Sequence, residues 1–324
     1  MNDDDNFLVE AFRRQLVRLV TAEAIRAIES GASGSELWRG LDESGFADAM
    51  VPESSGGAGI GLAQAFPLIS LAGEFCVPVP FAETMVARGI LAGQGAGAPG
   101  GAMIVLAPPS TVIPGGRFAG HALVDRAGVA TLVTATGVGD DIFGNGGVTE
   151  MAEGDVVAVL ALDPEAVLLA AAAVAAGLMA GAMARVLEMS LRYAGERRQF
   201  GRSLGKFQAI QQQLAVLAEQ VLSAQVAARN AFVGTTFDPV RVAAAKCRAN
   251  EAAGMVCNIA HAIHGAIGVT AEFDLQLYTR RIKHWQLAFG SESYWGARIG
   301  RARLASELAV TSDFLRLHLS AMVA

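Results

Sequence analysis

The feature that most restricts the fold of this chain is residues 166–184, AVLLAAAAVAAGLMAGAMA, a stretch of 19 residues without a polar side chain. Such a run either crosses a membrane or lies inside a folded domain. Most of its residues are alanine or glycine, which insert weakly into lipid compared with leucine or isoleucine, and no aromatic belt flanks it. Small side chains also suit close contact between helices. We therefore expect a buried helix of a bundle rather than a membrane span.

Charge and cysteine content exclude several classes of protein. The net charge is −6, which argues against a protein that binds nucleic acid. The three cysteines have neither the spacing of metal ligands nor that of a disulfide framework. The first residues, MNDDDNFLVE, are acidic where a signal peptide is basic. Together these observations predict a cytoplasmic protein.

Three regions of the chain differ in their sequence pattern. Residues 1–92 show apolar side chains at helical spacing, interrupted by glycine-bearing loops such as VPESSGGAGIGL. After the break AGQGAGAPGGA, residues 93–162 contain short β-branched runs bounded by glycine and proline, which are typical of strands. Residues 163–324 return to long helical segments. The expected fold class is mainly α, with an N-terminal helical domain, a small shortened β domain and a C-terminal four-helix bundle.

The start of the bundle carries a capping signal. Asp163, Pro164 and Glu165 follow the order of an N-cap, a proline at the first helical position and an acid in the first turn, so the first helix should begin at Pro164. Four helices are expected, at about residues 164–194, 204–232, 238–266 and 274–311. The apolar residues of the second recur at alternating intervals of three and four, which predicts a narrow stripe suited to a bundle.

The junction of the first two bundle helices, RYAGERRQFGRSLGKFQAIQQQLA, combines cations, an aromatic residue and two glycines. The glycines allow the chain to turn, and the next helix should begin near Ser203 or Leu204. A helix N-terminus with free amides and nearby guanidinium groups suits a pyrophosphate, and Phe200 could cover a heterocycle or a ribose. The alternative for such a segment is a solvated basic turn.

This junction also resembles the C-terminal bundle signature of the acyl-CoA dehydrogenase family. The stretch ESGFADAMVPESSGGAGIGLAQAFPLISLAGEFCVPVPFAET resembles the N-terminal helical domain of that family. HAIHGAIGVTAEFDLQLYTRRIK resembles its glycine turn and the entry to its final helix. The resemblance covers two of three domains in the expected order. It implies a flavoprotein oxidoreductase that uses FAD for the α,β-dehydrogenation of acyl-CoA thioesters.

The resemblance further implies which residues contact FAD, mainly FAD that a neighbouring subunit binds. The matching positions are Arg197, Gln199, Phe200, Gln208, Gly265, Gly268 and Ser291. The first three would touch the pyrophosphate, and the two glycines match a turn that approaches the adenosine end. Near that turn the family often has a second glycine and an upstream glutamine, where this chain has Ala266 and Ala262.

The catalytic base is the main departure from the family. The reaction needs a carboxylate that removes the substrate α-proton while hydride leaves the β-carbon for the flavin, and a dry site raises its pKa usefully. The usual position holds Phe289, within LAFGSES, and the position that some members use instead aligns near Ala171. Neither side chain accepts a proton. Glu292 and Glu165 are weak replacements, since each would need displaced geometry.

The middle region departs as well. Family members carry a Thr-Glu-Pro-type loop that cradles the flavin ring and the thioester, and no such motif occurs between residues 101 and 162. The resemblance therefore implies that the retained residues serve a partner's flavin, whereas the missing ones would complete the chain's own site. This asymmetry predicts one subunit of a heteromeric acyl-CoA dehydrogenase, for instance a heterotetramer with a paralogous chain in lipid or steroid catabolism.

Two alternatives remain on the sequence alone. One is a self-sufficient homo-oligomeric enzyme with Glu292 or Glu165 as its base. The other is a flavin-free acyl-CoA-binding or structural partner protein. The histidines at 261 and 264 lack cysteines or carboxylates at metal spacing, so we expect them to pack or cap rather than bind metal. Glu272 and Asp274 are expected to cap and charge the start of the last helix.

Overall fold

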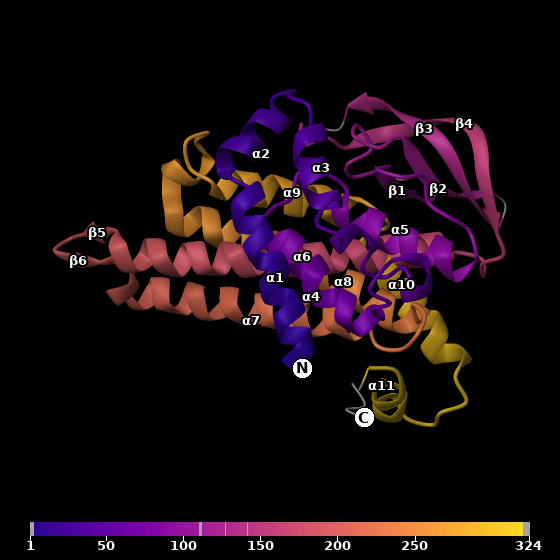
Figure 1. Cartoon of the computed structure of the whole chain (residues 1–324). Helices are drawn as coiled ribbons and strands as arrows, with labels where there is room; N and C mark the ends of the chain where they lie inside the picture. Colours follow the sequence, from indigo (N-terminus) through magenta and orange to yellow (C-terminus); the bar gives the residue numbers. More distant parts are fainter. Residues whose placement is uncertain (1–2, 110–111, 127, 141, 320–324) are drawn as a thin grey trace.

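The structure is a computed structural model that describes residues 3–109, 112–126, 128–140 and 142–319. N-terminal helices, a four-stranded sheet and C-terminal helices surround a shared hydrophobic core (Figure 1). The predicted fold class, mainly helical with a small β region between two helical ones, is confirmed.

The N-terminal region is built from α-helices joined by short loops. They are α1 (Asp3–Leu19), α2 (Ala22–Glu29), α3 (Ser35–Asp42), α4 (Leu62–Glu74) and α5 (Phe81–Gly93), with 3-10 turns η1 (Phe46–Asp48) and η2 (Glu53–Ser55). The first helical stretch is divided at Thr21, whose Oγ1 accepts the amide of Ala24 at 3.2 Å and so caps α2. Phe12 and Leu16 of α1 are fully buried and join these helices to the core.

The sheet has the order β1-β2-β3-β4. Its strands are β1 (Ile104–Ala107), β2 (His121–Arg126), β3 (Val129–Asp140) and β4 (Val148–Leu160). β1 and β2 are parallel, and the other pairs are antiparallel, with Leu123 opposite Leu132. These two leucines face the main core, whereas Val105 and Val133 face a second apolar cluster on the other side of the sheet. The alternation follows from the two-residue period of a strand.

Helix α6 (Ala166–Glu196) is the central element, and the expected buried helix is confirmed. By length and composition alone it could cross a membrane, as could residues 239–269, but 89 % of its most apolar window is buried in the fold, against 44 % for the second segment. Helix α4 crosses α6 at two glycines. A Cβ on Gly73 would lie 2.0 Å from the carbonyl oxygen of Leu178, and one on Gly181 would lie 1.8 Å from that of Ser70. Any larger residue would force the two helices apart.

The remaining helices correct the expected pattern. They are α7 (Gln208–Asn230), α8 (Pro239–His264), α9 (Leu275–Leu287), α10 (Glu292–Ala305) and α11 (Thr311–Leu319). The single helix expected at 274–311 is wrong, because α9 and α10 are separate. Phe289 and Gly290 have φ angles of 60° and 97°, which no α-helix can continue. Ser291 Oγ then accepts the amide of Tyr294 at 3.2 Å and starts α10.

The expected start of the first bundle helix is also wrong. Helix α6 begins at Ala166, since Glu165 has a φ angle of 68° and lies outside the helix. Asp163 contributes its carbonyl oxygen, which accepts the amide of Ala166 at 3.1 Å, rather than a side-chain cap. The second bundle helix begins at Gln208 rather than near Ser203, because a 3-10 turn, η3 (Leu204–Lys206), precedes it.

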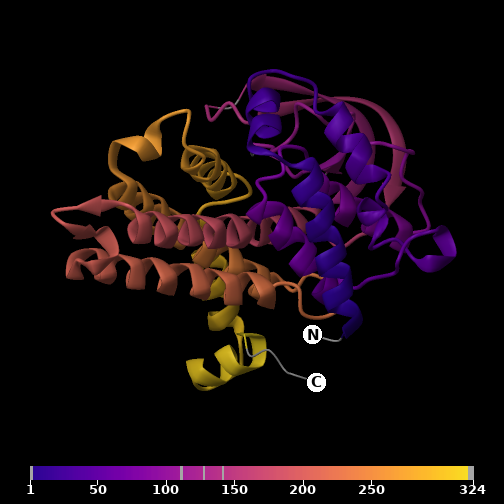
Figure 2. The same ribbon diagram turned by 60° about the vertical axis from the view of Figure 1, so that its left-hand side comes forward.

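Helices α6 and α7 form an arm that extends away from the sheet (Figures 1 and 2). Two short strands, β5 (Arg198–Gln199) and β6 (Arg202–Ser203), make a hairpin at its end. We call residues 197–208 the arm tip. In both views the arm tip lies at the opposite end of the molecule from β3 and β4.

Candidate functional site

The hairpin of the arm tip turns at Phe200 and Gly201, whose φ angles are 50° and 80°. Two successive residues with positive φ are the mark of a two-residue hairpin turn that matches the twist of the strands. The register pairs Arg198 with Ser203 and Gln199 with Arg202. Glycine adopts this backbone without strain, but phenylalanine does so only at a cost. The sequence feature QFG thus becomes a tight turn that projects an aromatic ring.

Most side chains of the arm tip are exposed, and its arginines have no carboxylate partner within the described chain. Phe200 is 91 % exposed. Arg198 donates to the carbonyl oxygen of Gly201 at 3.2 Å, and the Arg202 guanidinium lies 4.0 Å from the ring centroid of Phe207. Within the part of the chain that the structure describes, the arginines at 197, 198 and 202 form no salt bridge with a carboxylate. Their positive charge is therefore not neutralised inside this chain.

The start of α7 adds backbone donors to this surface. Its N-cap, Phe207, provides no side-chain hydrogen bond, so the first two amides of the helix, those of Gln208 and Ala209, keep free donors, whereas that of Ile210 donates to the carbonyl oxygen of Phe207 at 3.0 Å. Gln208 is exposed, and Gln211 Nε2 donates to the carbonyl oxygen of Gly205 at 2.9 Å, which fixes the turn. Uncapped amides beside unpaired guanidinium groups form a donor set that fits a pyrophosphate.

The glycine turn lies beside the last turns of α6. Helix α8 ends at His264, and Gly265 follows with a φ angle of 66° at the start of η4 (Gly265–Val269). The His264 ring stacks on Tyr193 of α6 with centroids 4.5 Å apart, and its Nδ1 lies 2.7 Å from the carbonyl oxygen of Ala260. A Cβ on Gly268 would lie 3.0 Å from His264 Cβ, so a side chain there would disturb this stack. His264 therefore packs, as expected.

The α9–α10 turn, in contrast, places the Phe289 ring in the core. Phe289 is 2 % exposed and Ala171 is fully buried, and both belong to the main core. Trp295 Nε1 donates to the carbonyl oxygen of Phe289 at 2.9 Å. Lys246, also fully buried, donates to Asn250 Oδ1 at 2.6 Å and to the carbonyl oxygen of Trp285 at 2.9 Å. Burial lowers the pKa of Lys246 to about 7.

The two weak candidates for a base lie outside this core. Glu165 receives two hydrogen bonds from Arg298, at 2.8 and 2.6 Å, and this guanidinium holds the pKa of the carboxyl below its ordinary value. A general base for an α-proton would need a raised pKa instead. Glu292 is an exposed residue in the first turn of α10. Ser291, assigned to the cofactor by resemblance, caps the same helix.

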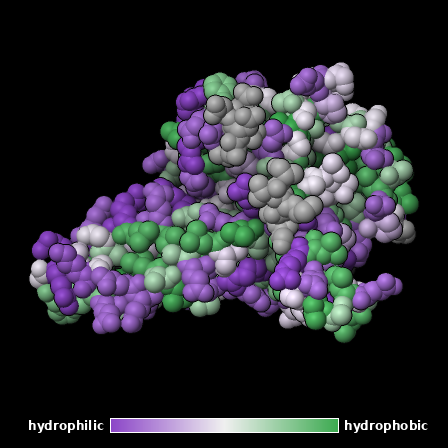
Figure 3. Space-filling view, turned by 90° about the horizontal axis from the view of Figure 1, so that it is seen from below, coloured by the Kyte–Doolittle hydropathy of each residue, from purple (hydrophilic) through white to green (hydrophobic). Residues whose placement is uncertain are grey.

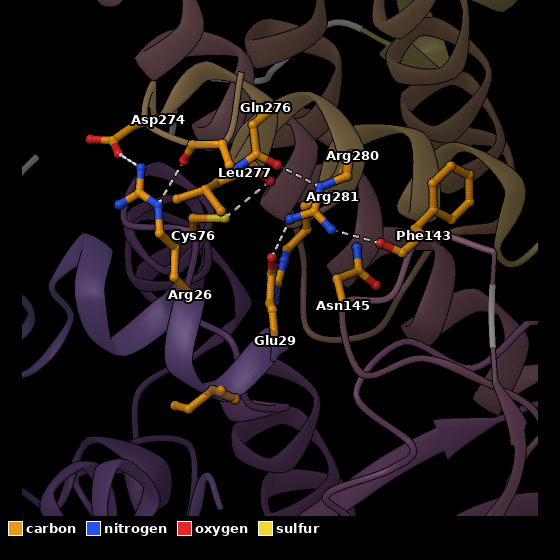
Figure 4. Close-up of polar contacts among 12 residues, drawn as sticks. Arg26, Glu29, Cys76, Phe143, Asn145, Asp274, Gln276, Leu277, Arg280 and Arg281 are labelled. Atoms are coloured by element: carbon orange, nitrogen blue, oxygen red, sulfur yellow. Dashed lines mark hydrogen bonds and ion pairs between the residues drawn. The ribbon is translucent and has the colours of Figure 1, made fainter. Parts of the chain in front are cut away.

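An inter-domain polar cluster was missed by sequence reasoning (Figure 4). Glu29 of α2 forms ion pairs with Arg280 and Arg281 of α9, and Nη1 of Arg280 donates to the carbonyl oxygen of Phe143 in the β region at 2.8 Å. Asp274 lies at the start of α9 but makes no side-chain cap; its carboxylate pairs with Arg26 of α2. Asp274 thus occupies the N-cap position as expected, but the expected side-chain cap is absent, since its backbone already has helical angles (φ −69°, ψ −15°) and its Oδ1 accepts from Arg26.

A second missed residue is Glu83, in the first turn of α5. It is 6 % exposed, and burial raises the pKa of its carboxyl to about 7, although Arg281 opposes the shift. The available signal was a single acid within the apolar stretch VPVPFAETMVA. Periodicity alone did not show that this acid faces inward.

Comparison with known proteins identifies the scaffold. The model of the acyl-CoA dehydrogenase C-terminal domain matches residues 157–304. The acyl-CoA dehydrogenase IpdE2 of Mycolicibacterium smegmatis is 30% identical over 300 residues, which cover 87% of this chain and 93% of that protein. The "Tcur3481-Tcur3483 steroid ACAD", in a variant form, superposes with a TM-score of 0.82 at 26% identity, covering 94% of this chain and 99% of that one.

A further solved structure, the ChsE4-ChsE5 complex from Mycobacterium tuberculosis, shares the fold, with a TM-score of 0.80 at 22% identity over 95% of this chain and 99% of that one. The likeness to these structures spans all three regions, and the identity to IpdE2 extends over most of both sequences. The chain therefore belongs to the acyl-CoA dehydrogenase family of FAD-dependent oxidoreductases.

Proposed function

We propose that this chain is one subunit of a heteromeric acyl-CoA dehydrogenase, that its arm tip holds FAD bound mainly by a neighbouring subunit, and that it does not provide the base. The observation that carries the proposal is the position of the arm tip. Its exposed, uncompensated cations and Phe200 lie at the far end of the molecule from the chain's own sheet (Figures 1 and 2). A flavin held against that sheet would be out of their reach.

In this proposal the arm tip contributes hydrogen-bond donors and one aromatic ring to the FAD site of the partner. The Arg197 guanidinium and the first amides of α7 would donate hydrogen bonds to the pyrophosphate, while Gln199 and Gln208 offer further amide donors beside it. The exposed face of Phe200 would cover an apolar part of the cofactor. Bound FAD would accept the hydride in the α,β-dehydrogenation. Gly265 and Gly268, next to the last turns of α6, would leave room for the adenosine end.

The core around Phe289 supports the second half of the proposal. Phe289 and Ala171 are buried among apolar side chains, so the two positions that could hold a base are both inert here. Glu165 is engaged by Arg298, and Glu292 is exposed to solvent. The carboxylate that accepts the α-proton would then belong to the partner subunit. A paralogous acyl-CoA dehydrogenase chain is the partner that could supply it together with a complete flavin cradle.

An apolar surface along the arm supports assembly. Seen from below, hydrophobic side chains gather along α6 and α7 (Figure 3). Leu191 on α6 and Leu222 and Val226 on α7 are each more than half exposed. Burying such residues against another subunit would be favourable. Two relatives carry two-chain names, "Tcur3481-Tcur3483 steroid ACAD" and the ChsE4-ChsE5 complex. By analogy we propose a cytoplasmic heterotetramer acting on a lipid- or steroid-derived acyl-CoA.

The test is the visible absorption of the purified chain, expressed alone and together with the product of the adjacent gene. We expect flavin bands, at about 370 and 450 nm, only after co-expression. Bands from the chain alone in a homogeneous, active homo-oligomer would contradict the heteromer. Absence of flavin from the purified complex would instead favour the flavin-free partner protein.

A further inference from the structure

A small cavity lies where α5 meets α9. Its walls come from the end of α4, the segment before α5, the start of α5, the loop at residues 114–115, α6 and α9. The space that water-sized molecules can occupy in it is about 20 Å³. Most of the walls are apolar, including Leu178 and Trp285, but Glu83 and Arg281 also line it.

Glu83 brings to this cavity a buried carboxyl that forms no ion pair or side-chain hydrogen bond within the described chain. The side chain is 6 % exposed. In the described parts of the chain it has no ion pair within 4.0 Å and no hydrogen bond to another side chain, so its remaining contact is with its own backbone amide. A buried carboxyl normally has several partners, because removing it from water without replacements is costly. Its free acceptor positions need a donor.

Arg281 brings to the same cavity a guanidinium with one hydrogen-bond donor that has no acceptor. Its Nη1 donates to the carbonyl oxygen of Val77 at 2.9 Å, and its Nη2 donates to Glu29 Oε1 at 2.7 Å. Its Nε is buried and has no hydrogen-bond partner. The two Nη atoms of the guanidinium are thus hydrogen-bonded, whereas the buried Nε lacks an acceptor. One acceptor that also donates to Glu83 would satisfy both residues.

We propose that the cavity is a hydration site that holds one water molecule, which donates a hydrogen bond to the Glu83 carboxyl and accepts one from Arg281 Nε. A water needs roughly 10–15 Å³ of such space and two to four polar partners, and this cavity meets the first need and supplies two partners. The volume is too small for a larger guest. The bridge joins α5 to α9, and through Arg281, Glu29 and Arg280 it reaches α2 and the β region (Figure 4).

The bridge also makes the contact between α5 and α9 sensitive to pH. Burial raises the pKa of Glu83 from 4.5 to about 7, and Arg281 opposes that shift. Of the other groups near the cavity, Glu29 is paired with both arginines, and burial raises the pKa of the Cys76 thiol to about 11, so it stays neutral. The lining residues of α6 and the 114–115 loop carry no titratable side chain.

The sign of the effect follows from linkage. A carboxyl whose pKa is raised by folding contributes stability fully below pH 4.5, and that contribution is lost as the pH rises through about 7. The free energy of unfolding should therefore decline across this window in the wild-type chain. Glu83→Gln keeps an acceptor oxygen but no titration, so this part of the decline should disappear.

Two measurements on the full chain test the proposal, in its complex if the chain requires one. A high-resolution crystal structure should show an ordered water between Glu83 and Arg281 Nε in the wild type and in Glu83→Gln, but not in Glu83→Leu. The infrared band of a protonated carboxyl should titrate near pH 7 and vanish in Glu83→Gln. An empty cavity in the wild type would overturn the water site. A band that persists in Glu83→Gln would overturn the pH sensitivity.

Discussion

In the described chain, two of the Phe-Gly turns have positive φ angles at both residues but opposite surroundings. Phe200-Gly201 ends the arm, and Phe289-Gly290 separates α9 from α10. The phenylalanines have φ angles of 50° and 60°, and the glycines that follow have φ angles of 80° and 97°. Phe200 is 91 % exposed, whereas Phe289 is 2 % exposed. The same backbone therefore projects one ring into solvent and places the other in the core.

The difference shows how each strained turn is maintained. A phenylalanine with positive φ costs on the order of 1–3 kcal/mol. At Phe289 burial of the ring and the hydrogen bond from Trp295 Nε1 offset this cost within the chain. At Phe200 the contact is an edge-on approach to Phe207, with centroids 6.3 Å apart. We infer that the strain at Phe200 is balanced by a ligand or a partner, which agrees with the proposed contact to FAD.

The largest expected effect separates the two rings. Phe289→Glu places an unpaired charge in the core and should lower the free energy of unfolding by about 4 kcal/mol. The matched variant Phe200→Glu should change it by less than about 0.5 kcal/mol, since the ring is exposed. Urea unfolding of both variants at neutral pH measures the difference. Equal losses would show that the two turns do not differ as described.

A smaller effect concerns what the exposed turn binds. Arg197→Ala in the co-expressed complex should weaken FAD binding by about 10- to 100-fold, because a charge-assisted hydrogen bond contributes roughly 1.5–3 kcal/mol. The flavin released on dilution gives the dissociation constant. Arg18→Ala, on the exposed end of α1, is the control and should leave binding unchanged. Similar flavin retention in both variants would remove the arm tip from the cofactor site.

Replacing each phenylalanine by glycine should change stability in opposite directions at the two turns, and the gain expected at Phe200 is smaller than the effects above. Phe200→Gly relieves the positive φ and loses little burial, so the free energy of unfolding of the chain without FAD should rise by about 1 kcal/mol. Phe289→Gly relieves similar strain but loses a buried ring, which costs about 3 kcal/mol or more. Thermal unfolding in the absence of flavin compares them. A loss of stability in Phe200→Gly would mean that contacts within the chain already support this ring.

The smallest effect tests whether either carboxyl near the Phe289 core acts as the catalytic base. Glu292→Gln and Glu165→Gln should each change turnover of the complex by less than about twofold, since both carboxyls are exposed and Arg298 holds that of Glu165 in an ion pair. Steady-state rates with the acyl-CoA substrate of the complex measure this. A large fall in either variant would restore the self-sufficient enzyme with a relocated base.

Sequence patterns predicted the elements better than their ends. The helical–β–helical order and the burial of α6 followed from periodicity and from the uncharged stretch. The start of α6 at Pro164 and a continuous helix at 274–311 were wrong, because Glu165 and Phe289 adopt positive φ angles that their residue types do not announce. Asp274 was assigned to a cap, but Arg26, which is distant in sequence, binds its carboxylate.

For the proposed site too, the sequence showed which residues occur together, and the tertiary structure showed where they lie. The cations, Phe200 and the glycines of the arm tip are contiguous, so the sequence by itself determined that they occur together on one turn. Tertiary structure alone decided that this turn lies far from the sheet (Figure 1), that Phe289 faces the core, and that Glu83 of α5 and Arg281 of α9 line one cavity. Periodicity and turn chemistry are local properties, whereas burial, pairing and distance depend on contacts between segments far apart in the chain.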